Sequence, residues 1–90
     1  MQPLMIQKIS IPVSVTLYFD HKLRRSVPVN ILWEGRVYPI TKIGLHHTYR
    51  AGRTLFHVFS AESPSLFFRL VLNSETLHWL VEEISDGEAN

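Results

Sequence analysis

The chain of 90 residues contains no cysteine. Disulfide bonds, thiolate nucleophiles and cysteine-ligated zinc or iron–sulfur centres are therefore excluded. No apolar run approaches the roughly 20 residues that a helix needs to cross a bilayer, and residues 1–10 lack the apolar core of a signal peptide. We therefore expect a cytoplasmic protein without a membrane partner.

Common catalytic motifs are missing as well. The four glycines are isolated, at positions 35, 44, 52 and 87, so no Gly-x-Gly-x-x-Gly or Walker sequence can form. No serine lies in a Gly-x-Ser-x-Gly sequence, and the adjacent Glu82 and Glu83 are more simply an exposed pair than a carboxylate dyad. We therefore expect no catalytic residues and no cofactor, and a protein that is not an enzyme.

Charge is distributed unevenly along the chain, although the net charge is only +1. Residues 1–53 contain eight of the nine lysines and arginines but two acids, whereas residues 54–90 contain one arginine and six acids. Such a separation can attract an anionic partner to the basic half. It can equally bring two copies of the chain together head to tail.

Apolar and polar residues alternate without interruption over residues 9–20, with the odd positions on the apolar face as far as Phe19. This is the pattern of a half-buried β-strand. Pro12 cannot donate a ladder hydrogen bond, so we expect the first half of this strand to lie on a sheet edge.

The next segment, residues 27–33, alternates in the same way and leads into Glu34-Gly35, which we expect to form a two-residue hairpin turn. One return strand then begins at Arg36. Its apolar phase shifts from even to odd positions near Thr41-Lys42, which predicts a β-bulge that bends the strand. Ala51-Gly52 predicts the turn that follows.

The last apolar stretch, residues 77–84, fits a helical stripe. A strand is favoured, because threonine, tryptophan and valine, which occur in or next to this stretch, are common in strands. A short C-terminal helix is the alternative. The whole pattern predicts an all-β fold, with a single domain over residues 1–90 and frayed ends at residues 1–8 and 85–90. We expect five or six antiparallel strands in a strongly bent sheet or a partly open barrel of SH3-like or OB-like type.

Cations and tyrosines are interleaved through the basic half of the chain. In small barrels that bind single-stranded nucleic acid, cations hold phosphates beside rings that stack on bases. The alternative is that these residues are solvated loop charges and core aromatics. The candidate nucleic-acid-binding residues are Lys22, Arg24, Arg25, Arg36, Lys42, Arg50, Arg53, Tyr38 and Tyr49.

Several expected strands also carry apolar residues on the face that is otherwise polar. A small barrel cannot bury two faces alone, so we expect these residues to contact either a second copy in a homodimer or another protein. The candidate interface residues are Tyr18, Leu32, Phe67, Val71 and Leu80.

His46 and His57 are the candidates for metal binding. If Ala51-Gly52 forms a two-residue turn, their side chains lie opposite each other on neighbouring strands, with Cβ atoms about 5 Å apart. His78 or a glutamate would have to complete the ligand set. An ordinary cross-strand pair is the simpler interpretation, and we expect no bound metal.

The hairpin sequence Trp33-Glu34-Gly35-Arg36-Val37-Tyr38 resembles a Trp-x-Gly-Arg-x-Tyr motif in an uncharacterised bacterial family of small β proteins. Tyr49-Arg50 and Trp79-Leu80-Val81 would occupy later motif positions, so the resemblance extends over roughly residues 27–86, and His46-His47 stand where that family has a tryptophan. The family has no established activity. The resemblance implies a β fold, and an association with nucleic acid through the proximity of some family genes to DNA-repair polymerase genes.

The same hairpin also has a structural explanation, because Arg36 is expected to lie over the Trp33 indole. Taken together, the sequence predicts a non-enzymatic small β binding module. Nucleic acid, held through the basic hairpins, is the first hypothesis for its partner, and protein interaction or self-assembly is the second.

Overall fold

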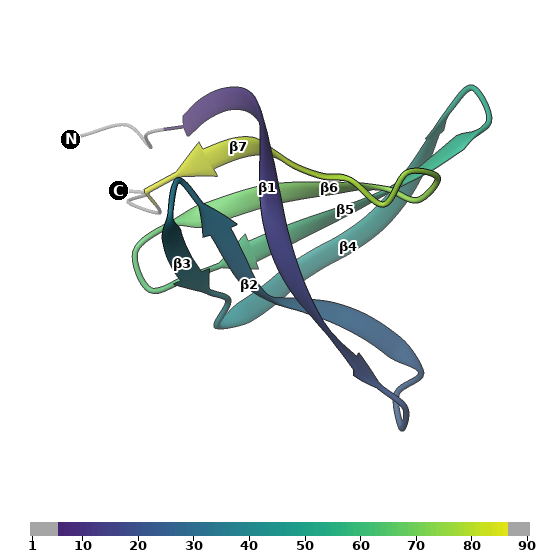
Figure 1. Ribbon diagram of the computed structural model, residues 1–90, viewed down its shortest axis with the longest axis horizontal. Coiled ribbons are helices and arrows are strands. Elements are labelled where there is room, and N and C mark those ends of the chain that lie inside the picture. Colours follow the sequence, from purple (N-terminus) through teal and green to yellow (C-terminus); the bar gives the residue numbers. More distant parts are fainter. Residues whose placement is uncertain (1–5, 87–90) are drawn as a thin grey trace.

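The computed structural model describes the backbone of residues 6–86 and the side chains of residues 9–86. Within this part of the chain, seven strands form one antiparallel sheet and no helix is present (Figure 1). The prediction of an all-β fold is confirmed. The strands are β1 (Ile6–Asp20), β2 (Arg25–Trp33), β3 (Arg36–Pro39), β4 (Lys42–Ala51), β5 (Thr54–Glu62), β6 (Phe67–Asn73) and β7 (Trp79–Ser85).

The expected number of five or six strands is too low, because the return strand that begins at Arg36 is divided in two. β3 ends at Pro39, before β4 begins. The bulge predicted near Thr41-Lys42 is therefore misplaced. The chain turns a corner there, and the register shift lies further along, between Ile43 and His46.

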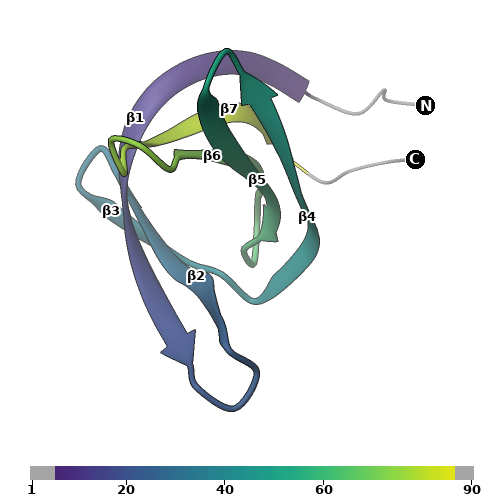
Figure 2. The same ribbon diagram turned by 90° about the vertical axis from the view of Figure 1, so that its right-hand side faces the viewer.

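The order of strands in the sheet is β3-β2-β1-β7-β6-β5-β4, so β3 and β4 follow each other in the chain but lie at opposite edges. The sheet curls until the two edges meet at one corner. There the Ile40 N–H donates to the Val29 carbonyl at 2.9 Å, and the Thr41 N–H donates to the Glu62 carbonyl at 2.7 Å. In the described residues no ladder joins β3 to β4, so the sheet is not closed into a barrel. Figure 2 looks into the curl.

Strand β1 divides its pairing between two neighbours. Residues 6–13 pair with β7, and residues 14–20 pair with β2. The first half therefore has one paired side in the described structure, as Pro12 predicts. The apolar alternation predicts a buried face as far as Phe19. This prediction is wrong from Leu17 onward, because the register shifts between Thr16 and Leu17 and the β1–β2 ribbon leaves the core there. Leu17 is 46% exposed and Phe19 is 61% exposed.

The hydrophobic core lies inside the curl. The β2–β3 hairpin is held over it by ring contacts, with Tyr38 5.3 Å from Phe68 and Trp33 6.0 Å from Tyr38 between ring centroids. Each buried large apolar side chain contributes about 1.5–3 kcal/mol by leaving water. Packing thus maintains the curl without closure of the barrel. The buried cluster contains Ile31, Phe59, Ala61, Phe68, Leu70, Trp79, Val81 and Ile84.

Two tight turns connect long hairpins. The predicted turn at Glu34-Gly35 is confirmed, and both residues have left-handed backbones (φ 52° and 75°), as a type I′ turn requires. The second turn is formed by Gly52-Arg53 and not by Ala51-Gly52, because Ala51 still pairs with Thr54 in the ladder.

The last strand begins later than expected. Leu77, with φ 65°, belongs to the preceding turn, and β7 starts at Trp79. The alternative of a C-terminal helix is wrong, because β7 pairs with β1 on one side and with β6 on the other. Of the ends expected to fray (residues 1–8 and 85–90), residues 1–5 and 87–90 lie outside the described residues, whereas the backbone of residues 6–8 and of Ser85 pairs in the sheet. No helix that is long and apolar enough to cross a membrane is found in residues 6–86.

Candidate binding pocket between two basic hairpin arms

Two hairpins extend beyond the core on the same side of the molecule (Figure 1). We call residues 17–27 the β1–β2 arm and residues 49–56 the β4–β5 arm. Figure 2 faces that side and shows one arm on each side of the mouth of the curl. Side chains that point between the arms are therefore accessible from solvent.

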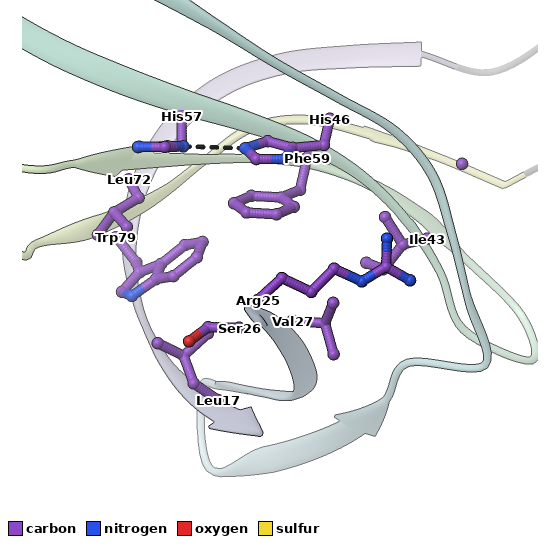
Figure 3. A pocket seen from close by; sticks show the side chains of 11 residues that line it. Leu17, Arg25, Ser26, Val27, Ile43, His46, His57, Phe59, Leu72 and Trp79 are labelled. Atoms are coloured by element: carbon purple, nitrogen blue, oxygen red, sulfur yellow. Dashed lines mark hydrogen bonds between the residues drawn. The ribbon is translucent and has the colours of Figure 1, made fainter. Parts of the chain in front are cut away.

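A pocket of about 530 Å³ lies in this mouth (Figure 3). Its volume is within the range of roughly 300–1,000 Å³ that is typical of small-molecule sites. Apolar side chains dominate, a few polar groups converge on them, and none of the described lining residues is acidic. The pocket is lined by Leu17, Val27, Ile43, Gly44, Phe59, Leu72 and Trp79, together with Arg25, Ser26, His46 and His57.

The two histidines of the pocket are in direct contact. Nε2 of His46 lies 2.9 Å from Nδ1 of His57, so one of these nitrogens donates a hydrogen bond and the other accepts it. The His46 ring stacks on Phe59, with 4.2 Å between centroids and 4° between planes. Among the described residues, no group of three His, Cys, Asp or Glu side chains is placed to hold a metal ion. The geometry is that of a hydrogen-bonded pair.

The electrostatics of the pocket favour a neutral His46. Burial lowers the pKa of His46, because its charged form loses hydration. The neighbouring positive charges of His57, His47 and Arg25 lower this pKa further. Arg25 carries the fixed positive charge of the pocket lining, which suits an anionic group.

Five of the seven cations that the sequence singles out lie on the arms. Lys22, Arg24 and Arg25 lie at the end of the β1–β2 arm, and all three are exposed. Arg50 and Arg53 are exposed at the end of the β4–β5 arm, where Nη1 of Arg50 donates to the Arg53 carbonyl at 3.3 Å. The fold thus places two groups of cations on opposite sides of one pocket.

Exposed rings accompany the cations on both arms. Tyr18 and Phe19 are exposed on the β1–β2 arm. Tyr49 is exposed on the β4–β5 arm beside Arg50, and its ring stacks on Phe56 at 5.1 Å with 12° between planes. Of the two tyrosines among the candidate binding residues, Tyr49 therefore lies exposed on the β4–β5 arm. On the β1–β2 arm the exposed rings are Tyr18 and Phe19.

Three predicted binding residues lie away from the arms. Arg36 and Tyr38 belong to the β2–β3 hairpin, and Lys42 opens β4 at the corner. The Arg36 guanidinium lies 5.4 Å from the centre of the Tyr38 ring and not over Trp33, because Arg36 and Tyr38 are two residues apart on the same face of β3. This contact gives Arg36 a structural role.

The predicted interface residues are not gathered on one surface. Tyr18 and Leu32 are exposed on β1 and β2, whereas Phe67 is exposed on β6. Leu80 is half-buried on β7, and Val71, its neighbour in the β6–β7 ladder, is only 3% exposed.

The pocket residues Leu17, Phe59 and Trp79 escape prediction from the sequence. In the linear pattern Leu17 is an ordinary apolar-face residue of an alternating strand, and Phe59 and Trp79 lie in apolar stretches without a recognisable motif. The interruption of the ladder near Leu17 has no signal in the sequence, because the apolar alternation continues through it.

Comparisons with known proteins provide no further guide, because no family model matches the chain and neither the curated proteins nor the solved structures gave a significant match.

Proposed function

We propose that the domain is a non-enzymatic binding module that holds single-stranded nucleic acid across its two arms. The observation that supports this best is that each arm carries exposed cations beside exposed rings, on either side of one pocket. The curled sheet then acts as an OB-like or SH3-like support that holds the two binding hairpins apart.

The cations supply the contacts to phosphate. The carboxylates of Asp20 and Glu75 already accept other hydrogen bonds. Asp20 Oδ1 accepts hydrogen bonds from the N–H groups of Lys22 and Leu23, and Glu75 Oε1 accepts one from the Thr54 hydroxyl. With five lysines and arginines on the arms, positive charge is in excess, and binding that neutralises phosphates must weaken as salt concentration rises.

The exposed rings supply a reason for single strands. A base that stacks on an aromatic side chain gains about 1–3 kcal/mol, whatever its identity. The bases of a duplex already stack on one another and offer their faces to Tyr18 or Tyr49 only at the helix ends. We therefore expect weak dependence on sequence and a preference for unpaired strands.

Fluorescence anisotropy with a labelled oligothymidylate tests the proposal, with a duplex as competitor. Affinity should fall with salt, and the pair of changes Arg24→Gln and Arg25→Gln should reduce the slope of log K against log salt by about 1.4, since each phosphate contact to a single strand contributes about 0.7. Changing Arg50 and Arg53 to Gln should act similarly. The control is Arg69→Gln, which removes one positive charge from β6, where Arg69 pairs with Glu82 at 3.0 Å, and its matched arm variant is the single change Arg24→Gln.

Affinity that is indifferent to salt would refute the proposal. So would an equal loss of affinity in Arg69→Gln and in the single arm variant Arg24→Gln, because nucleic acid would then respond to net charge and not to the arms.

Self-association through the β1–β2 arm is the second candidate. Leu17, Phe19 and Leu23 are all exposed there, and a two-stranded ribbon is only marginally stable in water without an apolar surface to pack against. Sedimentation equilibrium separates the candidates. A dimer that dissociates when Phe19 and Leu23 are changed to Ser supports self-association, and a monomer at high concentration excludes it.

A further inference from the structure

The pocket between the arms is a separate candidate binding site, because the arm cations other than Arg25 and the exposed arm rings lie outside its lining. We propose that the pocket takes one nucleotide of the bound strand, with its base between the apolar walls and its phosphate at Arg25. This inference rests on the proposed function and names the ligand of the central pocket.

The walls of the pocket suit a flat, apolar body. Phe59 and Trp79, whose ring centroids are 5.7 Å apart, form one side. Figure 3 shows Leu17 and Val27 on the opposite side. A planar ring placed between these walls contacts apolar groups on both faces.

The histidine pair supplies hydrogen-bonding groups. Its internal bond uses Nε2 of His46 and Nδ1 of His57, which leaves one nitrogen on each ring. While both rings are neutral, one of the two remaining nitrogens is a donor and the other an acceptor, whichever ring donates the internal bond. A nucleobase carries both kinds of group, whereas a fatty acyl chain carries neither.

Arg25 supplies the charge. Its side chain crosses the pocket towards Ile43 (Figure 3), and a guanidinium matches the oxygens of a phosphate with two parallel hydrogen bonds. Arg25 also belongs to the β1–β2 arm, so a strand lying along that arm reaches the pocket directly. With no acid among the described lining residues, nothing there repels a phosphate.

The indole N–H signals of the two tryptophans provide the measurement. Trp79 lines the pocket, whereas Trp33 packs on Tyr38 and Phe68 and serves as the internal control in the same NMR spectrum. Titration with 2′-deoxyadenosine 5′-monophosphate should shift the Trp79 signal in a saturable manner and leave that of Trp33 in place. Deoxyadenosine, inorganic phosphate and benzoate are the comparison ligands, and each should bind more weakly than the nucleotide.

Two variants test the two halves of the site. Val27→Phe fills the space for the base. It should lower the affinity for both the mononucleotide and the oligothymidylate about tenfold, which is the contribution expected of one stacked base. Arg25→Gln, at an exposed position, should lower the affinity for the nucleotide to that for the nucleoside without loss of the fold. Changing Arg50 and Arg53 to Gln should lower the affinity for the oligothymidylate and leave the affinity for the mononucleotide unchanged.

The outcomes separate this inference from the proposed function. Salt-dependent binding of the oligothymidylate without a shift of the Trp79 signal overturns the pocket proposal and leaves the function standing. A Trp79 shift with the mononucleotide, but no binding of the oligothymidylate, overturns the function and supports the nucleotide pocket. If benzoate shifts the Trp79 signal at the same concentration as the nucleotide, the pocket binds small organic anions and its assignment to a nucleotide is wrong.

Discussion

Nε2 of His46 lies 2.9 Å from Nδ1 of His57, although the two residues do not face each other across the β4–β5 ladder. His46 pairs with Phe59, and His57 pairs with Thr48. The histidines are therefore diagonal neighbours on the face that lines the pocket, a separation that ring side chains can span. Their hydrogen bond and the stack on Phe59 fix both rings at the pocket wall.

This contact predicts a loss of stability in acid. Burial and nearby positive charge lower the pKa of His46, so the folded protein binds a proton there less readily than the unfolded chain, whose histidine pKa is about 6.5. The contribution of this ring to stability is complete above that pKa and is lost as the pH falls below it. His46→Gln should therefore reduce the fall in the urea midpoint between about pH 7.5 and pH 5.5.

His21→Gln is the matched control for this experiment, because His21 is exposed in the turn between β1 and β2. If His46→Gln retains the full pH dependence of the parent protein, protonation of another group is responsible.

The contact between the two histidines also shows what alternation can predict. The turn lies at Gly52-Arg53, one residue later than expected, which changes each facing pair by two residues. Because side chains alternate with a period of two, such a displacement leaves every residue on its predicted face. His46 and His57 therefore share a face as expected, while their direct partners differ from those predicted.

The pocket could not be predicted in the same way. Phe59 and Trp79 come close to Arg25 through the curl of the sheet, which depends on the corner between β3 and β4 and on the packing of Tyr38 against Phe68. The Tyr38–Phe68 contact joins β3 to β6, which are not neighbours in the sheet. Alternation along one strand specifies its buried face, but it carries no information about which strand approaches from across a curl.

The β2–β3 turn should be sensitive to loss of its glycine. Gly35 has φ 75°, and a Cβ added there would meet no atom within 4 Å, so the cost of Gly35→Ala comes from the backbone alone. We expect a loss of about 1–2 kcal/mol in the free energy of unfolding, the cost of a left-handed residue with a Cβ. Urea denaturation measures it.

Gly44→Ala provides the comparison for that turn. Gly44 does not have a left-handed backbone, and its added Cβ would meet Ser60 at an ordinary 3.7 Å. We expect little change in stability. An equal loss in both variants would mean that contacts, and not the positive φ at position 35, are responsible.

The buried cluster should dominate thermal stability. Leu70 is 0% exposed on the inner strand β6, whereas Leu45 is 69% exposed on the edge strand β4. Leu70→Ala should cost about 2–5 kcal/mol, which lowers the melting temperature by roughly 4–8 °C per kcal/mol in a domain of this size. Leu45→Ala should stay within about 0.5 kcal/mol of the parent protein. A similar loss in both variants, measured by calorimetry, would contradict the assignment of the core.

Trp33 is half-buried against the core, and its Nε1 is buried without a hydrogen-bond partner among the described residues. A buried donor that lacks a partner costs about 1–3 kcal/mol. Trp33→Phe removes this cost while losing part of the packing on Tyr38 and Phe68, so the two effects oppose each other, and we expect a net change within about 1 kcal/mol.

Trp79→Phe is the informative contrast to Trp33→Phe. Trp79 belongs to the core cluster, and its Nε1 is not among the buried unpaired atoms of the described residues. The smaller Phe ring loses packing and removes no unpaired buried donor. The urea midpoint of Trp79→Phe should therefore fall further than that of Trp33→Phe. If Trp33→Phe is instead the more damaging change, by about 3 kcal/mol or more, Nε1 of Trp33 must have a hydrogen-bond partner in solution, and a bound water is the simplest such partner.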